Sequence, residues 1–264
     1  MYLRKYLRES RNILILVAVL LTIMTILVVK GEITMADHKI THFNTEDFPQ
    51  FGGFFVAALY AQSAVLAFVA WLMGGVGVGR NLGEECGSYL LTRPRSRAWF
   101  LWHDWAYGMA EIAVTVAATN LLLWQLAHFI MMQFNDPLHG RVVFHGDTSE
   151  YLLSTLMGLI FLCVLIFCGL VFSVTYFSTI VVKNSRGVVL GAGLFAGYVV
   201  LGTVIKHYWP TAVQLPHLVP QLFALGEGGV HGLSDSFGVS MAIHALVVLL
   251  FPVAAQQILD RSDI

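Results

Sequence analysis

The sequence is poor in charge. Asp, Glu, Lys and Arg make up 12% of its 264 residues, about half of the ~25% that is usual in soluble domains. Apolar residues make up 57%, and the mean hydropathy is +0.74. This composition excludes an ordinary soluble globular domain and is typical of a polytopic membrane protein. The formal net charge of −1 by itself says nothing about nucleic acid, and we expect no nucleic-acid partner.

Cysteine is scarce as well. The three cysteines, Cys86, Cys163 and Cys168, fall in an apolar run or in a polar segment that we place inside the cell. We therefore expect no structural disulfide.

Recognised nucleotide and metal motifs are also missing. The glycines at 74, 75, 77 and 79 match neither G-x-G-x-x-G nor G-x-x-x-x-G-K-[ST], and no H-E-x-x-H occurs. We expect no cofactor bound by this chain. Most of the ten histidines lie near the predicted outer face. Because no pair has tight ligand spacing, interfacial histidines are the favoured interpretation, and a copper or zinc role stays open.

What the sequence has in abundance is long apolar runs, since a bilayer-spanning helix needs about 20 apolar residues. They predict an all-α fold with six transmembrane helices in a single transmembrane domain over 1–264. The predicted spans are 13–29, 51–78, a span within 99–133, 150–182, 188–205 and 238–259. The first run is too long for a cleaved signal peptide and is expected to be retained.

Two further segments have a membrane character. Residues 1–12 alternate apolar and basic positions at helical spacing, which predicts an amphipathic helix lying on membrane lipids. Residues 206–237 keep apolar side chains but contain Pro210, Pro216 and Pro220. Apolar sequence broken by proline predicts a re-entrant segment, with Pro216 and Pro220 as candidates to line a substrate path.

The positive charges set the expected topology. Eleven of the fifteen Lys and Arg residues lie in the N-terminus, the segment 80–98, the turn at 183–186 and the C-terminal tail. Positive charge is retained on the cytoplasmic side. We therefore expect a multi-pass protein of the cell inner or plasma membrane, with both termini cytoplasmic and the re-entrant segment outside.

The segment between the second and third apolar runs is the most distinctive stretch. Residues 84–97 read EECGSYLLTRPRSR, which resembles the pattern E-x-G-T-x-x-x-L-L-x-x-P-x-S-R of type-2 ABC transporter permeases. Ser88 stands where threonine is usual, and Arg95 where valine is frequent. One residue, Tyr89, separates Ser88 from the leucine pair, where the pattern has three. A helix here would end before Pro94, because proline disfavours a helical conformation at the preceding residue.

The resemblance implies a function. In that family this segment is a coupling helix that docks on a separate ATPase subunit, which binds ATP and Mg²⁺. It implies a permease subunit of an ABC exporter, without its own nucleotide site, paired with a second permease copy or a relative. The weakly charged spans favour a hydrophobic or lipid-like cargo. The coupling residues carried over are Glu84, Glu85, Gly87, Leu90, Leu91, Arg93, Pro94 and Arg97.

Three alternatives remain beside it. A generic basic loop would fit a membrane scaffold or assembly factor, including the copper-enzyme maturation type of permease. Glu84-Glu85 could open the E-E-x-x-x-R motif of an intramembrane protease, but the sixth position is Tyr89. Ser240 and His244 lie one turn apart, and without an acid they are interpreted as packing rather than as a nucleophile and its base.

Several polar or small residues fall inside the spans. Gln62 and Ser63 are candidates for the substrate path, and Glu111 is expected to pair with an arginine of the segment 80–98. The glycines at 187, 191, 193 and 197 form small-x-x-x-small rows that predict close packing with another helix, within the chain or across a dimer.

Overall fold

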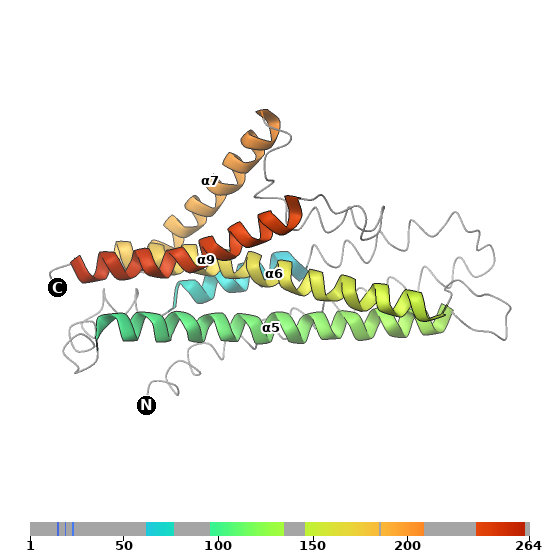
Figure 1. Cartoon of the computed structure of the whole chain (residues 1–264). Coiled ribbons are helices and arrows are strands. Elements are labelled where there is room, and N and C mark those ends of the chain that lie inside the picture. The colour runs from blue at the N-terminus through green and yellow to red at the C-terminus, as the bar shows by residue number, and fades with distance from the viewer. Residues whose placement is uncertain are drawn as a thin grey trace.

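The computed structural model describes Ile15, Val19 and Ile23 and the ranges 62–76, 96–134, 146–184, 186–208 and 236–261. All regular secondary structure in these residues is α-helical, which confirms the predicted all-α class for this part of the chain. Figure 1 labels four helices: α5 (Arg97–Phe134), α6 (Gly146–Val182), α7 (Gly187–Tyr208) and α9 (Ser236–Arg261). A shorter helix, drawn in cyan, covers residues 62–74.

Three helices are long and apolar enough to cross a membrane, at Arg97–Gln125, Gly158–Val182 and Gly238–Arg261. They correspond to the predicted third, fourth and sixth spans, and they make this a membrane protein by length and composition. α5 has 38 residues and α6 has 37. At 1.5 Å per residue each is about 55 Å long, so each exceeds the ~30 Å hydrocarbon core.

Helix boundaries fall close to those expected, with two differences. α6 begins at Gly146, before the predicted start of its span at residue 150. α7 continues to Tyr208, so residues 206–208 are helical rather than the start of the re-entrant segment. The remainder of that segment, with Pro216 and Pro220, lies outside the described residues, as does the amphipathic segment 1–12.

The predicted first and second spans are described in part. Ile15, Val19 and Ile23 are helical and exposed, at the i, i+4, i+8 spacing of one helix face. Within 51–78 the helix at 62–74 gives way to a turn at Gly75, with Gly75 N–H bonded to the Leu72 carbonyl at 3.1 Å. The helix therefore ends within its glycine cluster, before the predicted limit of the span at residue 78.

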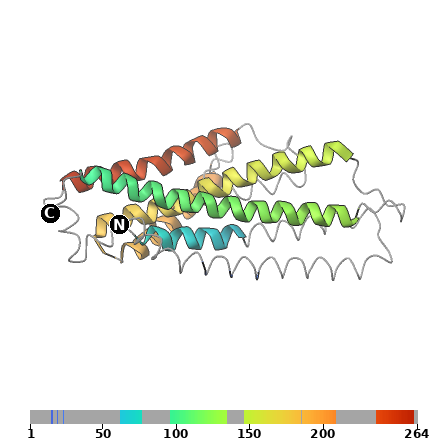
Figure 2. The ribbon, with the colours of Figure 1, turned by 90° about the horizontal axis from the view of Figure 1, so that it is seen from below.

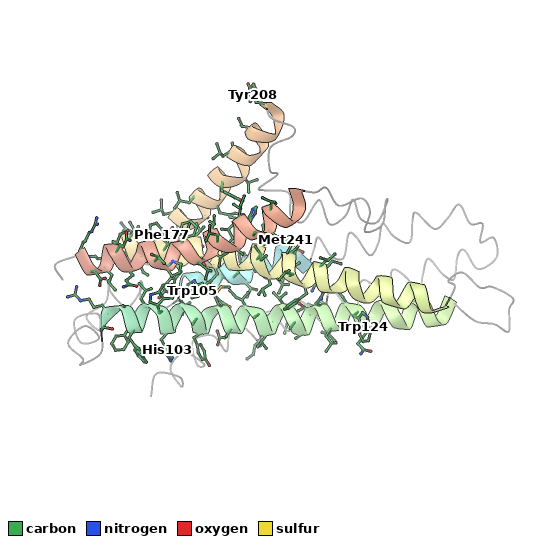
Figure 3. The ribbon with its side chains drawn as sticks, viewed as in Figure 1. His103, Trp105, Trp124, Phe177, Tyr208 and Met241 are labelled. Carbon is green, nitrogen blue, oxygen red and sulfur yellow. The ribbon has the colours of Figure 1, made fainter. Side chains whose placement is uncertain are left out.

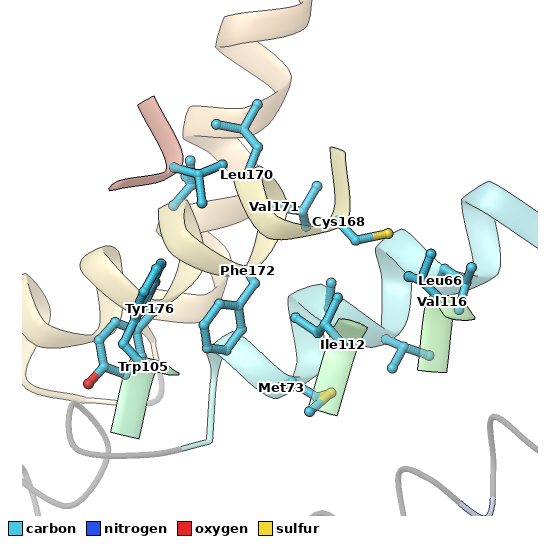
Figure 4. Close-up of a cluster of buried hydrophobic side chains, with 14 of the residues drawn as sticks. Leu66, Met73, Trp105, Ile112, Val116, Cys168, Leu170, Val171, Phe172 and Tyr176 are labelled. Atoms are coloured by element: carbon cyan, nitrogen blue, oxygen red, sulfur yellow. The ribbon is translucent and has the colours of Figure 1, made fainter. Parts of the chain in front are cut away.

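α6 is the central helix of the described bundle. Of its span, 61% is buried inside the protein, against 28% for the spans of α5 and α9. Figure 4 shows Phe172 and Tyr176 of α6 facing Trp105 of α5, while Cys168 lies toward Leu66 and Val116. Cys163 and Cys168 are both buried free thiols. α6 therefore contacts each of α5, α7 and α9, and α5 also contacts α9.

The glycine row of α7 divides into two parts. A Cβ on Gly187 would lie 2.6 Å from the Ser178 carbonyl oxygen, and one on Gly191 would lie 2.8 Å from Thr175 Cα. A Cβ on Gly193 or Gly197 would meet nothing within 4 Å among the described residues. The predicted close packing is therefore confirmed for the first two glycines, against α6 of the same chain.

The first turns of α7 lie along α6, and the rest of the helix diverges from the bundle (Figure 1; Figure 2 gives the view from below). A tight turn reverses the chain between them, with Lys183 at a φ of 53°. That left-handed residue directly after Val182 is the usual way to end a helix. It confirms the predicted basic turn at 183–186. Val189, Val200 and Tyr208 of α7 are all exposed.

Candidate functional site

The predicted coupling residues are described only at their last member. Arg97 is the first residue of α5. Gln62 and Ser63 of the predicted substrate path are described, and both are buried. The other predicted site residues lie outside the described residues: Glu84, Glu85, Gly87, Leu90, Leu91, Arg93, Pro94, Pro216 and Pro220.

The boundary between the predicted coupling segment and α5 is well defined. The Trp99 backbone N–H donates to Ser96 Oγ at 3.2 Å, which is the hydrogen bond of a serine N-cap. The cap satisfies one of the N–H groups that lack a partner in the first turn of a helix. α5 therefore starts directly at the end of the motif 84–97.

Arg97 connects this first turn to the last turn of α9. Its Nη1 donates to the main-chain carbonyl of Leu259 at 3.3 Å. The last carbonyls of a helix have no partner within the helix and carry partial negative charge, so a guanidinium group is well suited to them. The last residue of the predicted coupling segment is thus attached to the sixth predicted span.

Two tryptophans one turn apart on α5 extend this connection. Trp102 Nε1 donates to Gln256 Oε1 of α9 at 2.8 Å, and Trp105 Nε1 donates to Ser173 Oγ of α6 at 3.0 Å. Trp105 is buried, and its indole packs at an angle against that of Trp102. Figure 3 shows Trp105 between the helices and His103 on the opposite, outer side of α5.

Tyr176 supplies a further link. Its hydroxyl donates to the Leu101 carbonyl at 3.1 Å, and both residues are buried. The carbonyl of Leu101 also belongs to the hydrogen bonding of α5 itself, so the bond fixes the main chain of α5 against α6. In a membrane such interhelical bonds contribute about 0.6–2 kcal/mol each.

The helix at 62–74 joins the same region. Trp71 Nε1 donates to the Val188 carbonyl of α7 at 3.0 Å. A Cβ on Gly74 would lie 2.8 Å from the Phe172 carbonyl oxygen, so only glycine permits this approach to α6. The last turn of helix 62–74, which precedes the predicted coupling segment, therefore packs closely against α6 and is hydrogen-bonded to α7.

We call this region the braced end: Trp71, Arg97, Trp102, Trp105 and Tyr176 with the groups to which they donate. Its hydrogen bonds join helix 62–74 to α7, α5 to α6 and α5 to α9. Three of these bonds start from the first three turns of α5, and they connect it to α6 and α9.

A second polar site lies on α7 and α9, away from the braced end. The hydroxyl of Tyr198 is hydrogen-bonded to Nε2 of His244, and His244 Nδ1 lies 2.7 Å from the Ser240 carbonyl oxygen. A carbonyl only accepts, so Nδ1 carries the proton and Tyr198 donates to Nε2. His244 thus bonds to the main chain of Ser240, which agrees with a packing role for this pair rather than nucleophilic chemistry.

A third polar position is Gln62, at the start of helix 62–74. Its side chain is 7% exposed, and its Oε1 accepts no hydrogen bond within the part of the chain that the structure describes. The buried face of this helix continues through Leu66, Ala70 and Met73, so Gln62 lies on the side that faces the bundle. A buried amide oxygen without a donor is costly and uncommon.

Metal binding finds no support in the described part of the chain, where no three His, Cys, Asp or Glu residues come together. His103 is exposed, and both ring nitrogens of His244 are hydrogen-bonded, to Tyr198 and to the Ser240 carbonyl. The predicted pairing of Glu111 with an arginine of the segment 80–98 stays a prediction, because Arg80, Arg93 and Arg95 lie outside the described residues.

The chain was compared with known proteins, and neither a family model nor a curated protein nor a solved structure matches it.

The aromatic residues near the start of the third apolar run predict a belt at the membrane surface, formed by Trp99, Trp102, Trp105 and Tyr107. Trp99 is exposed as such a belt requires, whereas Trp102 and Trp105 turn inward and donate to α9 and α6. Serine and glutamine inside apolar runs, at 173 and 256, were the available signal for their acceptors.

Proposed function

We propose that this protein is the permease subunit of an ATP-driven exporter of the ABC type, moving a hydrophobic or lipid-like cargo. The motif at 84–97 would dock on a separate ATPase subunit that binds ATP and Mg²⁺. The braced end would pass the resulting movement to the spans, and a second permease copy would complete the path. In this arrangement the braced end is cytoplasmic.

The observation that carries the proposal is the bond from Arg97 to Leu259. It joins the last residue of the family-like motif to a different span, at the point where a docked partner would apply force. Trp102 and Trp105 extend the connection to α9 and α6 within the next two turns. A generic cytoplasmic loop has no need of such rigid attachment.

The test is copurification of the tagged full chain from its native membrane. A chain labelled by a photoreactive ATP analogue is expected to copurify and to show ATPase activity. Glu85→Arg and Gly87→Trp in the motif are each expected to reduce both the recovery of that chain and the activity at least tenfold. Glu46→Arg is the control: it makes the same charge reversal between the first two predicted spans, on the side opposite the motif, and is expected to leave both unchanged.

Topology gives an independent test through Cys86, which lies inside the motif, while Cys163 and Cys168 are buried. A membrane-impermeant thiol reagent added to intact cells is expected not to label the chain, and to label Cys86 once the membrane is opened. Labelling of Cys86 in intact cells would place the motif outside and overturn the proposal.

A scaffold that binds a partner without transport is the second candidate, favoured by the rigidity of the braced end. The same copurification separates the two candidates. A scaffold would retain its partner with no photolabelled ATP-binding chain present, whereas an exporter subunit requires that chain.

A further inference from the structure

Gln62 sits in an uncharged surrounding. The described residues 62–76 carry no charge, nor do 112–125 of α5 or 158–182 of α6. The labelled side chains in Figure 4 place Leu66 beside Val116 and Met73 beside Ile112, so helix 62–74 runs antiparallel to α5. One turn before Leu66, Gln62 therefore lies at the level of Thr119, one turn after Val116.

The neighbouring hydroxyl on α5 does not serve as a donor to Gln62. Thr119 Oγ1 donates its single proton to main-chain carbonyls of its own helix, with Thr115 O and Val116 O both at 3.0 Å. Thr115 likewise donates to the Glu111 carbonyl at 2.8 Å. The hydroxyls at this level are thus bonded along α5, and the Gln62 oxygen is left without a proton from them.

A buried acceptor of this kind lowers stability. An unsatisfied buried polar group costs about 1–3 kcal/mol, whereas an apolar group of the same shape carries no such cost. Leucine or methionine would fill the same place on the Leu66 face without that penalty. An amide kept at a cost to stability is explained when a ligand supplies the missing proton.

We propose that Gln62 binds the head group of the cargo, and that the cargo is a neutral amphiphile whose head carries a hydroxyl or amide N–H. This inference rests on the proposed function, and it names the class of substrate and the residue that binds its head group. The free oxygen selects a hydrogen-bond donor. An anionic head would find no cation on the surrounding spans, and burying an unpaired charge costs far more than a hydroxyl does.

The binding is testable without an ATPase. The full chain is reconstituted in nanodiscs of phosphatidylcholine, whose head group has no hydrogen-bond donor, and its thermal unfolding midpoint Tm is measured. Dioleoylglycerol, with one free hydroxyl, is the probe. Its 3-O-acetyl ester, in which that hydroxyl is blocked, is the matched control. Dioleoylglycerol is expected to raise Tm by several degrees and the ester to leave it unchanged.

Two variants at position 62 and one elsewhere complete the design. Gln62→Leu and Gln62→Met are expected to raise the starting Tm, because the unsatisfied group is gone, and to abolish the shift given by dioleoylglycerol. Gln125→Leu removes an exposed amide from α5 and is expected to keep the full shift.

The inference is overturned if dioleoylglycerol and its ester act alike on the native chain, or if Gln62→Leu keeps the shift. A Tm lowered by both variants would show that the amide is bonded within the fold, and would also overturn it. None of these outcomes depends on the ATPase, so they leave the copurification test of the exporter role unaffected.

Discussion

The two regions of α7 are attached to the bundle by different means. Near its start, Gly187 and Gly191 bring its main chain against α6, and the Val188 carbonyl accepts a bond from Trp71. Further along, contact is made by side chains: Phe195 against Phe167, and Tyr198 with His244. Main-chain packing leaves little room for relative movement, whereas side-chain contacts can break singly.

α9 has residues both in the braced end and in the region around Tyr198. Gln256 and Leu259 belong to the braced end, while His244 lies three turns earlier. Pro252 stands between them inside the helix. A proline removes one main-chain hydrogen bond and weakens the helix locally. We therefore expect α9 to bend at Pro252 when the braced end moves relative to the Tyr198 region.

The largest expected effect on stability comes from a substitution that separates α7 from α6. Gly191→Ala places a Cβ 2.8 Å from Thr175 Cα, which forces α7 and α6 apart. Overpacking of this kind costs about 1–3 kcal/mol. Gly193→Ala, on the same helix, meets open space among the described residues and serves as the control.

Thermal unfolding in detergent micelles measures the difference between these two variants. Both gain the same helix propensity from alanine, so their difference reports packing alone. Equal Tm values would show that α7 is not fixed to α6 at Gly191, and would remove the contrast between its two regions.

The helices were largely predictable from the sequence, and the reason is physical. Apolar runs end where charges or glycines begin, as at Val182 before Lys183, and the bilayer fixes their length. What the sequence could not supply was which helix is central. Lipid-facing and protein-facing positions are equally apolar in a membrane, so hydropathy did not distinguish the buried α6 from its neighbours.

The next effect in size tests the buried bond of Trp105. Trp105→Phe keeps an aromatic ring but leaves Ser173 Oγ without its donor, at a cost of about 1–2 kcal/mol. Trp99→Phe makes the same change at an exposed position and is expected to be close to neutral. Adding Ser173→Ala to Trp105→Phe should recover part of the loss, because both partners are then apolar.

No recovery in the double variant would mean that the loss reflects the smaller ring rather than the bond. Trp105 would then be an ordinary packing residue. The braced end would then be held only by its remaining bonds, and its rigidity would differ less from that of the Tyr198 region.

Arg97→Leu is expected to have a smaller effect on stability, about 1 kcal/mol, since the bond to Leu259 is partly exposed and involves one guanidinium nitrogen. Arg186→Leu, in the exposed turn after α6, is the charge-matched control. In the purified complex, Arg97→Leu should reduce transport per ATP hydrolysed more than it reduces Tm. Equal values for the two variants would show that Arg97 is not a point of force transfer.

Few residues of the candidate site were predictable from the sequence. Arg97 emerged from a local pattern, and Gln62 was recognised as polar inside a span. The acceptors Ser173 and Gln256 are separated from their tryptophans by 68 and 154 residues. A single sequence contains no signal that pairs positions so far apart, so the bracing became visible only in the folded chain.

The smallest expected effect is that of Tyr198→Phe. Loss of the hydroxyl removes the donor to His244 Nε2, and one interhelical bond in a membrane contributes about 0.6 kcal/mol on average. We therefore expect Tyr198→Phe to change the position of α7 relative to α9 rather than Tm. Val200 and Leu246 are both exposed, on α7 and α9 respectively, and can carry spin labels in a Cys86→Ser background.

Without the Tyr198 hydroxyl, the distance distribution between these labels should broaden toward longer values. Labels on Val189 and Ile258, nearer the braced end and also exposed, should keep theirs. Broadening at both pairs would mean that the Tyr198 bond holds the whole bundle. Broadening at neither would mean that α7 and α9 stay in place without it. Only a change confined to the first pair supports a bundle in which one end is rigid and α7 can open at the other.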